Sequence, residues 1–232
     1  MRLGTVMAFC LLVWAQTVSA QDGPPQLVVT GVGTTRAVPD MAIVSLGVTA
    51  EDRVAQKAMD GVSEQIRAVF GAVVELGVAP EDVQTSALRL DPLWSNRSSV
   101  SGAGPEIRGF VATNDIILRL RDMTQLGEAL QKILEAGANR IGSIQFTLAD
   151  PKPVQDKARR AAVAEARRKA ELYADAAGET LGPILTIIEG GGGAPRPMMM
   201  ADARMASSPA MPVAGGELDI TAQVTITYAL GN

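Results

Sequence analysis

The spacing of apolar side chains changes several times along the chain, and each change predicts a new element. Residues 40–51, DMAIVSLGVTAE, alternate between two sets of side chains, which predicts a strand buried on at least one face. From about residue 52 to 76 the apolar positions fall at steps of three and four, so they line one face of a helix that Gly77 caps. Before them, residues 27–39 predict a short strand and a turn.

The middle of the chain predicts a hairpin and a second helix. Residues 82–94 and 106–122 are strand-like, and the polar run SNRSSVSGAGP between them predicts the tip of a long hairpin. Asp122 is then the expected N-cap of a helix, because Gln125 follows in capping-box position. The apolar stripe of this helix stops at Gly137.

The last part repeats the earlier order of elements. A strand at 140–150 is followed by an alanine-rich helix from about 153 to 177, which ends at Gly178. Two further strands are predicted at 180–190 and 216–230.

This order predicts an α+β fold built from two β-α-β-β repeats with antiparallel or mixed sheets, three packed helices and long hairpins. We assign repeat one to residues 27–121, a linking helix to 122–137 and repeat two to 139–230. A flexible loop rich in Met, Pro and Gly, residues 190–215, takes the place in repeat two that the polar tip has in repeat one.

The N-terminus predicts export. Residues 1–20 combine Arg2, a short apolar run and the small residues Val18-Ser19-Ala20, which together are typical of a signal peptide cleaved after Ala20. The run is too short to span a bilayer. Cys10, the only cysteine, would leave with the leader, so residues 21–232 must be stabilised by their core rather than by disulfides.

Charge and composition exclude several classes of function. The chain has a formal net charge of −4, which argues against a nucleic-acid surface. It contains no histidine, so Ser-His-Asp and Cys-His catalysis and His/Cys zinc sites are excluded. The residues identify no catalytic group, no cofactor and no small-molecule substrate.

A methionine cluster is the one candidate for metal chemistry. Thioethers are soft ligands that favour Cu(I), and they are also oxidised reversibly to sulfoxides. The surrounding Gly, Pro and Ser residues favour a flexible loop without such a role. The alternatives of loop, oxidant buffer and copper site stay open for Met198, Met199, Met200, Met205 and Met211.

Other motifs have structural interpretations. The Gly-x-Gly of TGVGTTR predicts a turn, because a dinucleotide fingerprint would continue into a helix. Polar residues in strand-like runs, Asp91 and Asn114-Asp115, are expected to face solvent, and a catalytic carboxylate pair finds no other support in the chain.

The third helix predicts one charged face and one small-residue face. Asp156 with Arg160 and Glu165 with Lys169 lie four residues apart in the favoured acid-first order. An oligomer contact or a contact with anionic lipid is the alternative use of this face. The opposite face is expected to pack closely against the sheet through Ala158, Ala162, Ala166, Ala170, Ala174 and Tyr173.

Four segments, in order, resemble bacterial SIMPL-domain proteins over nearly all of the chain after the leader: VVTGVGTTRAVPDMAIVSLGV, GFVATNDIILRLRDMTQLGEALQKILEAGANRIGSIQFTLAD, ARRAAVAEARRKAELYADAAGETLGPILTIIEG and GELDITAQVTITYAL. This family includes a bacterial oxidative-stress defence protein and a periplasmic immunogenic protein. The resemblance implies a periplasmic location, free or associated with the outer membrane. It also implies a loose link to oxidative-stress tolerance and self-association in some members, and it supplies no catalytic residues.

We therefore expect a non-enzymatic exported protein that acts as a homo-oligomer or through envelope interactions. The edges of its long hairpin strands could pair with a copy of the same chain. The alternative is soft-metal binding or oxidant buffering through the methionine loop.

Overall fold

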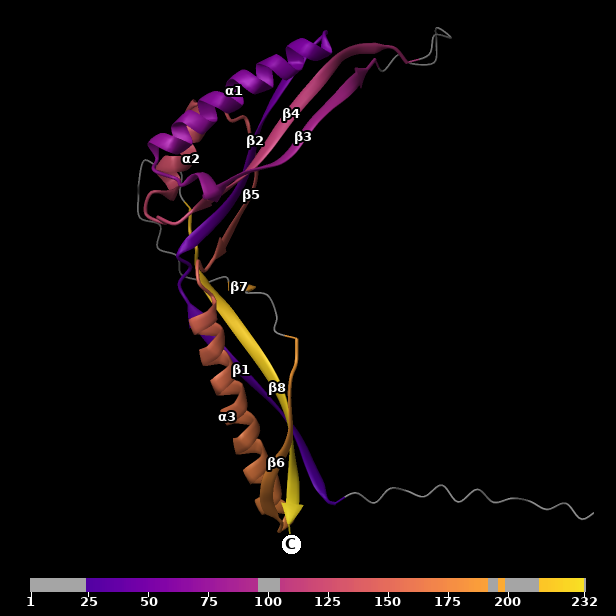
Figure 1. Cartoon of the computed structure of the whole chain (residues 1–232), viewed down its shortest axis with the longest axis vertical. Coiled ribbons are helices and arrows are strands. Elements are labelled where there is room, and N and C mark those ends of the chain that lie inside the picture. Colours follow the sequence, from indigo (N-terminus) through magenta and orange to yellow (C-terminus); the bar gives the residue numbers. More distant parts are fainter. Residues whose placement is uncertain (1–23, 96–104, 192–195, 199–212, 232) are drawn as a thin grey trace, which may run out of the picture.

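The computed structural model describes residues 24–95, 105–191, 196–198 and 213–231, which form two lobes stacked along the long axis of the molecule (Figure 1). The first lobe contains β2 (Met41–Asp52), α1 (Ala55–Glu75), the short helix η1 (Pro80–Asp82), β3 (Val83–Trp94), β4 (Ile107–Leu120), α2 (Leu126–Glu135) and β5 (Arg140–Thr147). The second lobe contains β1 (Gln26–Ala37), α3 (Lys152–Ala177), β6 (Thr180–Glu189), β7 (Arg196–Met198) and β8 (Glu217–Gly231).

Each lobe has one antiparallel sheet. The strand order is β3-β4-β2-β5 in the first lobe and β1-β8-β6 in the second, where β7 pairs with the beginning of β8. The α+β class, the three helices and the β3–β4 hairpin are therefore confirmed.

The two repeats do not coincide with the two sheets. β5 begins the second repeat, yet it pairs with β2 in the first lobe. β1 pairs with β8 and takes the place in the second lobe that β2 has beside β4 in the first. The side chains explain this exchange, because Ile144 and Phe146 of β5 pack on the core of the first lobe, whereas the glycines of β1 suit the alanine face of α3.

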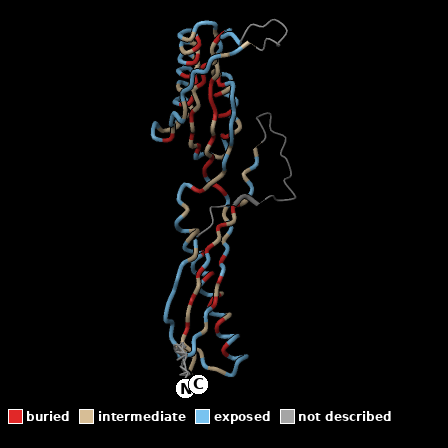
Figure 2. Tube along the Cα trace, turned by 90° about the vertical axis from the view of Figure 1, so that its right-hand side faces the viewer, coloured by how far each residue is buried: buried red, intermediate tan, exposed pale blue. Residues whose placement is uncertain are grey.

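The core of the first lobe is built from branched aliphatic side chains. The predicted stripe of α1 packs on the inward positions of β2 and β4, and α2 closes one end of the same cluster. Figure 2 shows this buried set in the strands and helices of this lobe. Its largest fully buried side chains are Val44, Leu46, Val48, Val62, Val69, Val73, Ile116, Leu118, Leu130 and Ile133.

In the second lobe, the helix contributes only small residues to the core, while β8 contributes large ones such as Leu218 and Ile226. The five alanines predicted for the buried face of α3 are all buried, and this helix lies mainly over β1 and β8. A Cβ atom on Gly31 would overlap the carbonyl oxygen of Ala162, and one on Gly33 would overlap that of Ala158. Gly31 and Gly33 are therefore inside one continuous strand, where they permit close helix packing, and the turn predicted from TGVGTTR is wrong.

Several local predictions are confirmed and others are wrong. Gly77 and Gly178 have positive φ angles of 72° and 76° after α1 and α3, as expected of C-terminal caps. Asp122 is not the N-cap of α2, which begins at Leu126. Its carboxylate accepts hydrogen bonds from the Thr124 backbone and the Gln125 side chain, so it stabilises the preceding turn instead. Tyr173 is exposed rather than packed on the sheet.

The charged face of α3 is internally paired, although not in the predicted register throughout. Glu165 contacts Lys169 at 3.8 Å, as expected. Asp156 pairs with Arg159 at 3.0 Å instead of with Arg160, since Arg159 also reaches Glu189 of β6.

Candidate functional site

β6 is an open edge of the second lobe. One side of this strand pairs with the C-terminal half of β8, and its other side pairs with no strand of the described chain. An edge of this kind presents unpaired backbone N–H and C=O groups, which can pair with another extended chain.

The side chains of β6 are apolar and exposed. Ile187 and Ile188 point to opposite faces of the strand, and 54% and 58% of their surfaces are accessible. Ile184 and Leu185 are also about half exposed. The reason is the placement of α3, whose contacts are mainly with β1 and β8 and few with β6 (Figure 1).

Only part of β6 carries the features that usually protect an edge. Pro183 and two register irregularities disturb the first half of the strand, up to Thr186. From Thr186 to Glu189 the pairing with β8 is regular. No lysine or arginine interrupts the strand, and its one charged residue, Glu189, is bound by Arg159 of α3 at 2.7 Å.

A buried hydroxyl lies beside this strand without a partner. Tyr228 of β8 pairs with Ile184 of β6, and its side chain is only 4% exposed. No described group forms a hydrogen bond with its Oη atom. Because an unpaired buried polar group is costly, this hydroxyl is an unsatisfied position in the core that α3 and β8 form.

The first lobe has a similar but weaker edge. α1 covers β2 and β4, so Leu88 and Leu90 of β3 are exposed on the helix side. β3 also carries Arg89 and Asp91, and charged side chains oppose pairing with another strand.

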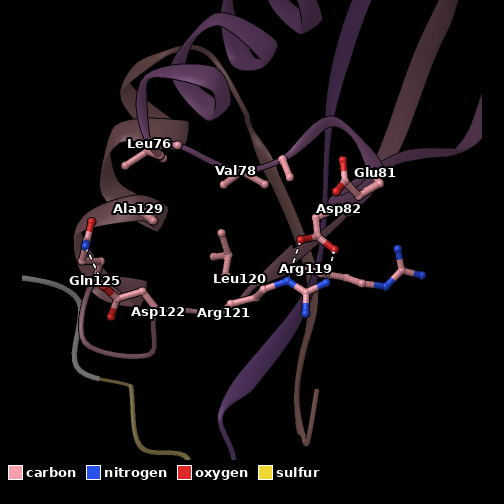
Figure 3. A pocket seen from close by; sticks show the side chains of 12 residues that line it. Leu76, Val78, Glu81, Asp82, Arg119, Leu120, Arg121, Asp122, Gln125 and Ala129 are labelled. Carbon is pink, nitrogen blue, oxygen red and sulfur yellow. Dashed lines mark hydrogen bonds and ion pairs between the residues drawn. The ribbon is translucent and has the colours of Figure 1, made fainter. Parts of the chain in front are cut away.

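The enclosed space nearest to a conventional binding site is a pocket of about 330 Å³ in the first lobe. Figure 3 shows its apolar wall, formed by Leu76, Val78, Leu120 and Ala129, and an ion pair on the other side. Arg121 donates to both oxygens of Asp82, at 2.8 and 2.9 Å. These hydrogen bonds, opposed by burial and helped by the charges of Arg121 and Arg119, hold the pKa of the Asp82 carboxyl below its usual range.

This pocket is better suited to structural support than to chemistry. Asp82 is buried and both of its oxygens are occupied, so it stays ionised at neutral pH and has no proton to give. The ion pair between Asp82 and Arg121 stabilises the contact of the connection between α1 and β3 with the end of β4.

The other predicted polar positions are not brought together. Asp115 lies half-buried on the open face of the first sheet, where Arg89 and Arg140 contact it at 2.9 and 3.5 Å. Asp91 is exposed and pairs with Val111, farther along the hairpin. A carboxylate pair is therefore not formed by Asp91 and Asp115.

The methionine cluster is mostly outside the described residues. The backbone of Met198 lies in β7, opposite Glu217, while Met199, Met200, Met205 and Met211 lie beyond the described ranges, as does the predicted leader 1–20. Within the described ranges, no group of three or more Asp, Glu, Cys or His residues could hold a metal ion. Soft-metal binding by the methionines stays a prediction.

The exposure of β6 is the feature that sequence reasoning missed. The run PILTII predicts a strand, and its lack of alternation is typical of a strand covered on both faces. Nothing in that run shows how far α3 extends over the sheet. Of the helices in the described part of the chain, none has the length and hydropathy needed to cross a membrane.

Comparisons with known proteins agree on one family. The family model SIMPL, described as a protein of unknown function (DUF541), matches residues 27–228. The 26 kDa periplasmic immunogenic protein of Brucella melitensis is 30% identical over 232 residues, which cover 97% of this chain and 92% of that protein. Uncharacterized protein YggE is 29% identical in Edwardsiella ictaluri, with 79% of this chain and 78% of that protein covered, and 29% identical in Escherichia coli, with 75% and 68% covered.

Proposed function

Because the chain belongs to the SIMPL family, whose function is unknown, we propose a role from the open edge of its second lobe: it is an exported, non-catalytic protein that acts by assembling with copies of itself through β6. The observation that carries this proposal is the combination of an unpaired backbone edge with exposed isoleucines on both faces of the same strand.

Antiparallel pairing of β6 with its copy suits the arrangement of the lobe. A two-fold axis perpendicular to the sheet would join two sheets edge to edge and leave both α3 helices on the same face. Ile184 and Ile187 of both copies, which lie on the helix side of β6, would then be enclosed between the two helices. Burial of these side chains and pairing of the free backbone groups would both favour the dimer.

Charge does not oppose this contact. β6 carries no ionised side chain from Thr180 to Ile188, and Glu189 at its end is neutralised by Arg159.

Export is part of the same proposal. It is supported by the predicted leader and by a relative that is named as periplasmic in Brucella melitensis. Association with the outer membrane and a role in oxidative-stress tolerance stay predictions, since no contact among the described residues argues for either.

Native mass spectrometry of residues 21–232 tests the assembly. We expect a discrete oligomer for the wild type and a monomer for Ile187→Lys at the same concentration, because a charge at this position would be buried in the interface. Val74→Lys is the matched control, since Val74 is an exposed valine on α1 in the other lobe. A monomeric wild type, or an Ile187→Lys variant that assembles normally, contradicts the proposal. A monomer that takes up Cu(I) in stoichiometric amounts would favour the methionine alternative.

A further inference from the structure

The two lobes are joined by thin connections. Within the described residues, two segments join elements of different lobes: 38–40 from β1 to β2, and 148–151 from β5 to α3. A third segment, 213–216, leads into β8 of the second lobe and begins at Val213, which packs on the first lobe. The extensive contacts between helices and strands are all within one lobe, and Figures 1 and 2 both show a narrow waist. Packing between elements therefore does little to fix the angle of one lobe to the other.

Asp40 connects two of these three segments. Its carboxylate Oδ1 accepts a hydrogen bond of 2.7 Å from the backbone N–H of Ala149, 109 positions away in sequence. Its own backbone N–H donates to the carbonyl of Thr147 at 3.2 Å. The side-chain bond spans the point where the chain leaves β5 for α3, whereas the backbone bond only extends the β2–β5 ladder.

The third segment is held by contact rather than by hydrogen bonding. A Cβ atom on Gly215 would come within 3.0 Å of Pro39 and 3.3 Å of Phe146, so this glycine lies close against the segment 38–40 and the end of β5. Val213, just before it, packs on the core of the first lobe. These contacts are apolar and non-directional, so they restrain an angle less than the short bond at Asp40 does.

We infer that Asp40 is a positioning residue that sets the angle between the two lobes through its bond to Ala149. Without this bond, the lobes would rotate about the waist while each keeps its own fold. The inference concerns a single protomer and holds whether or not β6 mediates assembly.

The experiment measures distances between the lobes by double electron–electron resonance. The natural sequence after residue 20 has no cysteine, so nitroxide labels can be placed on Val74→Cys in α1 and Leu172→Cys in α3, both exposed. Mixing with excess unlabelled protein removes distances between protomers. A second pair, Val74→Cys with Leu88→Cys, reports on the first lobe alone.

Three substitutions at Asp40 give different expectations. Asp40→Ala removes the hydrogen-bond acceptor. We expect the distribution of distances between labels on different lobes to broaden by roughly twofold, while the distances between the two labels in the first lobe are unchanged. Asp40→Asn keeps an oxygen at the same position and should preserve the wild-type distribution. Asp40→Glu keeps the charge but moves the oxygens by one methylene, so it should broaden the distribution. If Asp40→Ala fails to fold, the contrast between the Asn and Glu variants decides the question.

Asp150→Ala is the matched control. Asp150 lies in the same connection, but its carboxylate accepts from Lys152 two residues away and does not bridge segments, so its loss should leave the distribution unchanged. The inference is overturned if the wild-type distribution is already as broad as that of Asp40→Ala. It is also overturned if Asp40→Glu matches wild type or if Asp150→Ala broadens the distribution equally.

Discussion

The two lobes share the order strand, helix, strand, strand. They differ in the side chains with which their helices pack on the sheet. In the first lobe, Val, Leu and Ile side chains of α1 and α2 fill the space above β2 and β4. In the second, α3 contributes alanines that approach glycines of β1, and the helix lies so close to this side that β6 is left uncovered.

This difference indicates a division of roles. Large side chains allow one helix to cover a wide strip of sheet, so the first lobe encloses a larger core, although Leu88 and Leu90 at its β3 edge stay exposed. Small side chains bring the helix close but cover less, so the second lobe leaves apolar surface and an unpaired edge. Contiguous exposed apolar surface usually marks an interaction site, and a second copy is the partner that we propose for it.

The largest expected effect comes from the first core. Leu130→Ala in α2 removes a side chain that is fully buried, and it should lower the free energy of unfolding by about 3 kcal/mol. Leu172→Ala, on the exposed side of α3, should change it by less than about 0.5 kcal/mol. Urea unfolding of both variants measures the contrast, and equal losses would contradict the burial of Leu130 in the core of the first lobe.

A slightly smaller effect tests the close packing of the second lobe. Gly31→Ala places a methyl group against the backbone of α3. We expect the free energy of unfolding to fall by about 2 kcal/mol, because the helix and the strand must move apart. The control is Gly71→Ala in α1, where nothing lies near the new methyl group. Because alanine favours a helix more than glycine does, this variant should raise the free energy of unfolding by about 0.5 kcal/mol. If both glycine variants are equally stable, the helix does not depend on this close approach.

The dependence of stability on pH also distinguishes the lobes, because in the first lobe the buried carboxylate of Asp82 pairs with the exposed Arg121. The pKa of Asp82 is lower in the folded than in the unfolded chain, so its contribution is complete above the unfolded pKa. It is lost as the pH falls below about 4 and through the folded pKa. Asp82→Asn should therefore cost about 1 kcal/mol at pH 7 and flatten the loss of stability in acid. An unchanged acid profile for this variant would contradict that assignment.

The smallest effect on stability is expected where the effect on assembly is greatest. Ile187 is exposed in the protomer, so Ile187→Lys should change the unfolding free energy of the monomer by less than about 0.5 kcal/mol. The measurement is urea unfolding at concentrations low enough to keep both proteins monomeric. A large loss would mean that Ile187 belongs to the core of its own lobe.

The helices, most strands and the β3–β4 hairpin of this fold could be predicted from local patterns, but the long-range pairing of strands could not. The α1 stripe, the alanine face of α3 and the caps at Gly77 and Gly178 depend on spacing within one segment. The placement of β1 beside β8 depends on a contact between glycines and alanines more than 120 positions apart. The exposure of β6 depends likewise on the position of α3, which no single run of residues encodes.

Hydrogen exchange of the β6 amides, followed as protein concentration rises, tests the proposed assembly most directly. We expect exchange to slow in residues 180–189 as oligomers form, while the amides of α1 and β3 exchange at a constant rate. Oligomers that form without any change in β6, or with protection at β3 instead, would contradict it.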